Sequence, residues 1–167
     1  MNFVNIVVSA AVAASPAPSV PPVTPSKPLT AQQLFDAAST AQTENRCGEA
    51  IKGFEALEAR PAAARNEKVL ASIRARKGSC LATVGRTEEA IRDITAALAV
   101  LSPDNPVEKG DIARARMSLG KIAYLAFDYA GAEHEFETAR SLLPEDQQFD
   151  SLVWLARATM FDPDPKS

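Results

Sequence analysis

The sequence has little of the chemistry on which metal and nucleotide sites depend. Among 167 residues it has one histidine, two cysteines and seven glycines. The histidine, His134, has no second histidine or cysteine three or four residues away, so we expect it on a solvated surface and not in a zinc site. Gly120 and Lys121 lack the earlier glycine and the following Ser or Thr of a phosphate-binding loop. We therefore predict neither a bound metal nor a cofactor.

Catalytic motifs are equally scarce. Ser118 and Lys121 fit the S-x-x-K pattern of penicillin-recognising hydrolases, but the S-D-N and K-T-G elements that complete that site do not occur in the sequence. We predict that the protein is not an enzyme, and that Lys121 lines an inner surface of the fold.

An excess of positive charge is also missing. Lys and Arg number 18 against 21 Asp and Glu, for a net charge of −3. Nucleic acids and anionic membrane surfaces both attract a basic face. We therefore expect no nucleic-acid partner.

Residues 1–14 carry no charged side chain. The apolar stretch from Phe3 to Ala14 has the length of a signal-peptide core and is too short to span a bilayer. The run Ala11-Val12-Ala13 fits the small-x-small rule for cleavage, although no basic residue precedes Lys27. We predict a signal peptide, a periplasmic or secreted protein, and no stable membrane insertion after cleavage. The alternative is an Ala-rich tail.

Residues 15–29 are rich in proline, which fixes φ and removes a backbone donor. We expect an extended linker here, either a spacer that holds the domain off a surface or a passive lead-in.

The segment from Ser118 to Pro144 reads as two amphipathic helices joined by a tight turn. Gly120 and Ala132 are small, so the two helices can approach closely, and Phe136 supplies apolar bulk between them. A hairpin of this kind cannot bury both faces alone and needs copies of itself on either side.

Two further copies precede it. The residue that opens each second helix recurs at Ala50, Ala90 and Ala132, and the large apolar residue one turn later recurs at Phe54, Ile94 and Phe136. Both series have intervals of 40 and 42 residues. The residue spacing inside each hairpin is therefore constant, and the number of residues between one hairpin and the next varies.

This pattern resembles the tetratricopeptide repeat over roughly residues 31–144. Leu119-Gly120, Ala132, Phe136, Ala139 and Pro144 match its signature. The period exceeds the usual ~34 residues and approaches that of HEAT and armadillo units. The signature tryptophan is also absent, with Leu34, Arg74 and Arg116 near its place. The resemblance implies an all-α fold over residues 30–160: a right-handed α-solenoid of three hairpins and a C-terminal capping helix, followed by a disordered tail at 161–167.

Two expectations concern individual helices. A long helix from about Ala63 to Val84 carries Val69, Ile73 and Cys80 on one apolar side. The capping helix runs from Pro144 to about Met160, and its inner face is expected to contain the following apolar residues: Phe149, Leu152, Val153, Ala156 and Met160.

Cys47 opens one helix and Cys80 lies near the end of the next long one. Because consecutive helices of such a stack run antiparallel, these two ends adjoin, and we predict a disulfide between them. The alternative is a pair of buried free thiols.

In proteins with this repeat the first helices of the hairpins line a concave groove that takes peptides or extended segments. Arg76, Arg114 and Lys121 would make that groove mildly basic, which suits an acidic or C-terminal carboxylate group. The resemblance implies these groove residues: Gln32, Phe35, Ser39, Gln42, Ser72, Arg76, Ser79, Arg114, Met117, Lys121 and Tyr124.

We therefore expect a protein–protein interaction scaffold or adaptor of a bacterial cell envelope, with a protein or peptide partner. The alternative is an accessory or regulatory subunit, or a fragment, of an enzyme whose catalytic domain lies on another chain.

Overall fold

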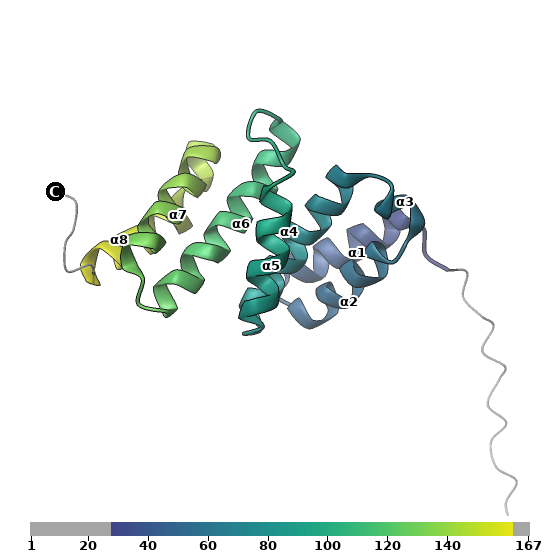
Figure 1. Ribbon diagram of the computed structural model, residues 1–167, viewed down its shortest axis with the longest axis horizontal. Helices are drawn as coiled ribbons and strands as arrows, with labels where there is room; N and C mark the ends of the chain where they lie inside the picture. Colours follow the sequence, from purple (N-terminus) through teal and green to yellow (C-terminus); the bar gives the residue numbers. More distant parts are fainter. Residues whose placement is uncertain (1–27, 162–167) are drawn as a thin grey trace, which may run out of the picture.

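The computed structural model describes residues 28–161 (Figure 1). The predicted signal peptide, nearly all of the predicted linker and residues 162–167 lie outside this range. The described part is all-helical and contains no strand, which confirms that the fold is all-α. Its helices are α1 (Ala31–Thr43), α2 (Cys47–Glu58), α3 (Pro61–Ala64), α4 (Glu67–Thr83), α5 (Thr87–Leu98), α6 (Pro106–Leu125), α7 (Tyr129–Leu142), the 3-10 turn η1 (Glu145–Gln147) and α8 (Phe149–Phe161).

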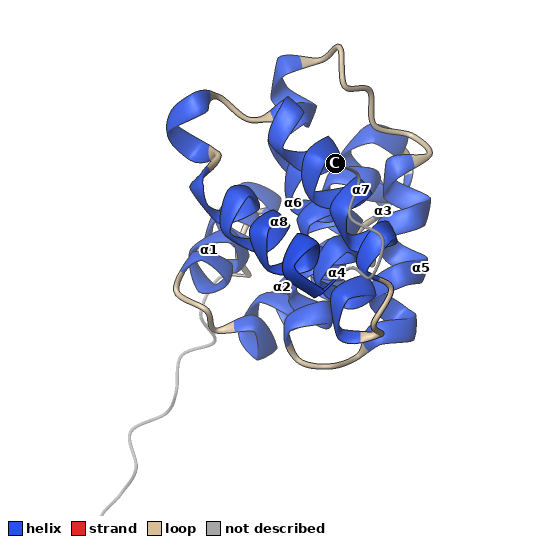
Figure 2. Ribbon diagram, turned by 90° about the vertical axis from the view of Figure 1, so that its left-hand side faces the viewer, coloured by secondary structure: helices blue, strands red, loops and turns tan. Residues whose placement is uncertain are grey.

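The helices pack as three successive pairs, α1 with α2, α4 with α5, and α6 with α7. Neighbouring pairs touch through α2 with α4 and through α4 with α6, and α8 packs on α7. Figure 2 shows this row of pairs from one end. None of the described helices is both long and apolar enough to cross a bilayer.

The turn inside each pair has the same backbone conformation. Asn45, Gly85 and Phe127 have φ of 59°, 80° and 64°, and each lies two residues before its second helix. The next residue donates its N–H to a carbonyl five positions back: Arg46 to Ala41, Arg86 to Leu81 and Asp128 to Ala123. This is the helix-ending bond of a Schellman motif. The three left-handed residues are again 40 and 42 apart, so the repeat found in the sequence is also a repeat of backbone geometry.

The core consists of small residues packed against large ones. Phe54, Ile94 and Phe136 are fully buried, as the repeat predicts. A Cβ added to Gly78 would lie 2.6 Å from Ile94 Cγ1, and one added to Gly120 would lie 2.5 Å from Phe136 Cε1. These glycines therefore allow the close approach of paired helices.

Helix ends follow their capping residues. The Thr30 side chain accepts from the Gln33 N–H and the Gln33 side chain accepts from the Thr30 N–H, a capping box that starts α1. The predicted helix from Ala63 to Val84 is wrong at its start. Asn66 interrupts it in extended backbone, and its side chain caps a new helix, α4, by accepting from the Val69 N–H. Val69 is consequently 45% exposed and does not extend the apolar side formed by Ile73 and Cys80.

The predicted inner face of α8 is also wrong. Phe149 and Met160 are 73% and 79% exposed, whereas Ser151 and Ala158 are buried. Trp154 is half-buried and stacks on Phe136, with ring centroids 5.9 Å apart. The small residues Ser151 and Ala158 permit the close packing of α8 on α7. The bulky residues Phe149 and Met160 lie on the opposite side of the helix.

Candidate functional site

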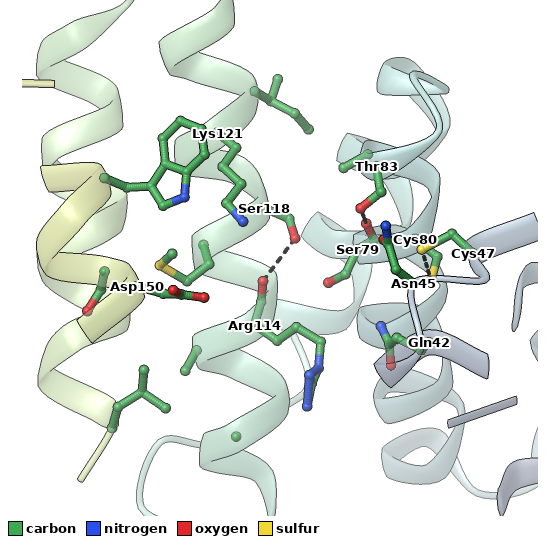
Figure 3. A pocket seen from close by; sticks show the side chains of 18 of the residues that line it. Gln42, Asn45, Cys47, Ser79, Cys80, Thr83, Arg114, Ser118, Lys121 and Asp150 are labelled. Atoms are coloured by element: carbon green, nitrogen blue, oxygen red, sulfur yellow. Dashed lines mark hydrogen bonds between the residues drawn. The ribbon is translucent and has the colours of Figure 1, made fainter. Parts of the chain in front are cut away.

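A hollow with a volume of about 710 Å³ lies along α4, α6 and α8, with the end of α1 at one side. We call it the groove. Residues of α1, α4, α6 and α8 converge on it, together with Cys47 at the start of α2. Its polar lining includes Gln42, Asn45, Ser79, Thr83, Arg114, Ser118, Lys121, Gln147 and Asp150 (Figure 3).

Five of the predicted groove residues line this hollow, namely Gln42, Ser79, Arg114, Met117 and Lys121. Three others, Gln32, Phe35 and Ser72, line a separate cavity of about 410 Å³ between α1, α3 and α4, which we call the N-terminal cavity. Ser39, Arg76 and Tyr124 line neither. Eight of the predicted groove residues are therefore divided between two hollows.

Arg76 separates the two hollows. On α4 it lies between Ser72, which faces the N-terminal cavity, and Ser79, which faces the groove. Its guanidinium carbon lies 5.1 Å from the Phe35 ring centroid, and its Nε lies 2.9 Å from Asp111 Oδ1. Ser72 Oγ donates to the other carboxylate oxygen of Asp111. The charge of Arg76 is therefore already compensated by the protein.

Arg114 is a cation of the groove that has no such partner. It forms no ion pair and donates no side-chain hydrogen bond among residues 28–161, and its Nε is buried. Burial lowers the pKa of Arg114, and the neighbouring positive charge of Arg76 lowers it further, while Asp111 acts in the opposite direction. Asp111 is paired with Arg76 and forms no ion pair with Arg114, which leaves a net positive charge on the groove floor.

Unsatisfied polar atoms concentrate around this point. Seven buried side-chain N and O atoms of the described residues have no hydrogen-bond partner, and five of them belong to Ser39, Gln42, Arg76, Asp111 and Arg114. Gln42 uses its Nε2 to donate to the Arg76 carbonyl at 3.0 Å, which leaves its Oε1 as a free acceptor. The Arg76–Asp111 pair is close as an ion pair, but its Nε and Oδ1 do not have hydrogen-bond geometry. Such a cluster is uncommon in a purely structural core.

The α8 end of the groove is aromatic and basic. The Lys121 ammonium lies 5.2 Å from the Trp154 ring centroid, and the Arg157 guanidinium lies 4.9 Å from it. Tyr124 lies beside the same indole, with ring centroids 5.6 Å apart. Helix periodicity does not identify Trp154 as a lining residue, because the inner face that it predicts for α8 is the wrong one. The small residues Ser151 and Ala158 were the signal that could have corrected this.

The two cysteines meet where the helix directions place them, but they do not form the predicted disulfide. Cys47 and Cys80 are free thiols with Sγ atoms 2.7 Å apart, longer than a covalent S–S bond of about 2.05 Å. Burial, reinforced by the hydrogen bond that Cys80 shares with Cys47, raises the pKa of Cys80 to about 12. A thiol held protonated in this way is a poor nucleophile and exchanges slowly.

No group of three or more His, Cys, Asp or Glu side chains within residues 28–161 could hold a metal ion. His134 is exposed on α7. Lys121 lies in the groove and contacts the Trp154 ring, as described above. No protein-family model matches the sequence, and a search of the curated proteins found no significant match.

Proposed function

We propose that this chain is a non-enzymatic binding module of tetratricopeptide type. Its three helix pairs form a right-handed solenoid with α8 as the terminal cap, and the groove takes an extended segment of a partner protein. The recurrence of the left-handed turn residue at Asn45, Gly85 and Phe127 supports the repeat architecture. Solenoids of this kind expose a continuous concave surface formed by equivalent helices.

The observation that carries the binding proposal is the state of Arg114. A guanidinium that is largely removed from water and has no protein partner is costly unless a counter-charge is supplied. A carboxylate on the bound segment would supply it with charge-assisted hydrogen bonds. The free Oε1 of Gln42 would accept a backbone N–H of the same segment.

The groove has room for such a ligand. Its volume of about 710 Å³ falls within the ~300–1,000 Å³ typical of ligand sites. At the α8 end, the Trp154 ring offers an apolar surface and Lys121 a second positive charge. We infer an acidic peptide, bound with a carboxylate at Arg114 and its neighbouring residues toward Trp154.

Residues 1–14 support an extracytoplasmic location, periplasmic or secreted, in which the module acts as a scaffold of the cell envelope. The free thiols of Cys47 and Cys80 give no support to an oxidising compartment. The localisation therefore rests on the apolar N-terminal stretch alone, and mass spectrometry of the protein from an expressing bacterium tests it. A chain that starts near Ala14 or Ser15 agrees with export, whereas cytosolic protein with intact Met1 contradicts it.

The binding proposal is tested with random decapeptides displayed on phage and the full chain as bait. A selected peptide is then measured by fluorescence anisotropy against the wild type, Arg114→Gln and the matched control Arg92→Gln, whose side chain is exposed on α5. We expect Arg114→Gln to weaken binding about tenfold or more, since hydrogen bonds to charged groups contribute ~1.5–3 kcal/mol. Arg92→Gln should leave it unchanged.

A peptide analogue with its acidic groups converted to amides should lose affinity for the wild type by a similar factor and bind Arg114→Gln no worse than the parent peptide does. Equal binding by all three proteins, or selection of no peptide, would refute the proposal. Thermal melts of each variant exclude unfolding as the cause of a loss.

A further inference from the structure

The outer side of α8 carries an exposed apolar stripe. Phe149, Leu152 and Met160 are 73%, 44% and 79% exposed, and Ala156 between them is exposed as well. These positions follow one another at three- and four-residue steps, so they share one face of the helix. The opposite face holds the buried Ser151 and Ala158. α8 is thus apolar on both sides, as a helix packed between two neighbours is.

The rest of the molecule indicates what belongs on that outer face. Each of the first helices α1, α4 and α6 is covered by the second helix of its own pair. α8 packs against α7 much as α4 packs against α2, which makes it equivalent to a first helix. Among residues 28–161 no second helix covers it. The outer face of α8 is therefore the position at which the packing pattern of the row would place a further helix.

The stripe is nearly symmetric along the helix. Leu152 lies three positions after Phe149, and Met160 lies four positions after Ala156. When a second α8 lies antiparallel across the stripe, Phe149 of one copy therefore meets Met160 of the other, and Leu152 meets Ala156. Each contact pairs a bulky side chain with a smaller or more adaptable one, which favours close packing. A surface that complements itself in this way is what a two-fold dimer requires.

The charges beside the stripe are complementary in the same arrangement. Asp150 and Arg157 are exposed, form no ion pair within residues 28–161, and lie seven residues apart on the flank of the stripe that borders the groove, where Asp150 lines the groove and Arg157 packs over the Trp154 ring. In an antiparallel pair related by a two-fold axis, each flank meets the same flank of the other copy. At 1.5 Å rise per residue, Asp150 then lies within about 2 Å, along the helix axis, of the level of Arg157 in the second copy. Two equivalent ion pairs would form at one edge of the interface.

We propose that two copies of this chain associate through the outer face of α8, as an antiparallel helix pair with Ala156 near its centre and reciprocal Asp150–Arg157 ion pairs. A pair of 13-residue helices is small beside the roughly 1,200–2,000 Å² of a standard interface, so the dimer is a weak, concentration-dependent one. The proposal does not depend on peptide binding in the groove.

Sedimentation equilibrium of the full chain, over about a hundredfold range of concentration, tests the proposal. The wild type should show a monomer–dimer equilibrium. Leu152→Glu and, independently, Met160→Glu should each raise the dimer dissociation constant about tenfold or more, because each places a carboxylate in the apolar contact of both copies. Val107→Glu is the matched control, since Val107 is 85% exposed at the start of α6 and lies outside the stripe.

A charge reversal separates this geometry from general stickiness. Arg157→Asp should weaken the dimer, because acidic groups of the two copies then face each other, and the addition of Asp150→Arg should restore it. Far-UV circular dichroism shows whether each variant is folded. A wild type that stays monomeric throughout, an equal effect of Val107→Glu, or a double variant that is no better than Arg157→Asp overturns the proposal. A monomeric wild type would leave the face to a different protein or to solvent.

Discussion

The aromatic ring of Phe136 lies directly against Gly120. A Cβ built on Gly120 would be 2.5 Å from Cε1 and 2.7 Å from Cδ1 of that ring. The ring is fully buried and Trp154 stacks on it, so it has little room to move away.

Phe136→Ala should lower the free energy of unfolding by roughly 3–5 kcal/mol, as large-to-small core substitutions do. Gly120→Ala should cost about 1–3 kcal/mol through overpacking. The double variant should be more stable than the sum of the two losses predicts, because the added methyl group fills part of the space that the ring leaves. Urea denaturation measures all three, and strict additivity would contradict the contact.

Buried thiols make a prediction about chemical reactivity. Because burial raises the pKa of Cys80 to about 12, native protein should react slowly with a thiol reagent at neutral pH. After unfolding in guanidinium without a reductant, two thiols per chain should react. Fewer than two would show that the cysteines pair covalently in solution.

Glu108 makes stability depend on pH in the acid range. Its carboxylate accepts the Ser102 N–H at 2.7 Å and an ammonium hydrogen of Lys68 at 2.9 Å, and these two contacts lower the pKa of Glu108. A lowered folded-state pKa means that the carboxylate stabilises the fold above the unfolded-state pKa of about 4.3. This contribution is lost as the pH falls through the folded-state pKa.

Glu108→Gln should therefore have a lower Tm than the wild type at neutral pH, and the two Tm values should converge as the pH falls below about 4. Glu137→Gln, on the exposed side of α7, is the control and should follow the wild type throughout. A gap that stays constant with pH would mean that Glu108 acts through packing alone.

Phe127 has a left-handed backbone conformation. In the equivalent turns of the other two pairs, this conformation is adopted by Asn45 and Gly85. A bulky residue pays about 1–2 kcal/mol for that conformation. Phe127 is 77% exposed, so burial of its side chain offsets little of this conformational cost. Phe127→Gly should raise the free energy of unfolding by about 0.5–1 kcal/mol, less than the full penalty because glycine gains entropy in the unfolded chain. Gly85→Ala should act in the opposite direction in the same thermal melts.

The sequence predicted the helix pairs well because their constraints are local and repeated. Gly120, Ala132 and Phe136 have counterparts at fixed intervals earlier in the sequence, so the positions of the helix pairs are supported by several residues at once. The inner face of α8 could not be found in that way, because α8 has bulky residues on two sides. Its orientation depends on how closely Ser151 and Ala158 fit against α7, which is a tertiary property.

The candidate site was predicted in part for the same reason. Helix periodicity places Arg76, Arg114 and Lys121 on first helices, but it does not say which of them finds an acidic partner. Asp111 neutralises Arg76 and leaves Arg114 free, and this distinction depends on side-chain distances between α4 and α6. The division into two hollows follows from that pairing.

The row of helix pairs also has a consequence for the speed of folding. Its principal contacts join helices that are adjacent along the chain or separated by one other helix. Few long loops must close before these contacts form, so the entropy lost early in folding is small, and proteins with such local contacts fold in microseconds to milliseconds. Opening can begin at either end of the row without breaking the contacts in its middle. The central pair, α4 and α5, should accordingly be the last part of the chain to exchange its amide hydrogens with solvent.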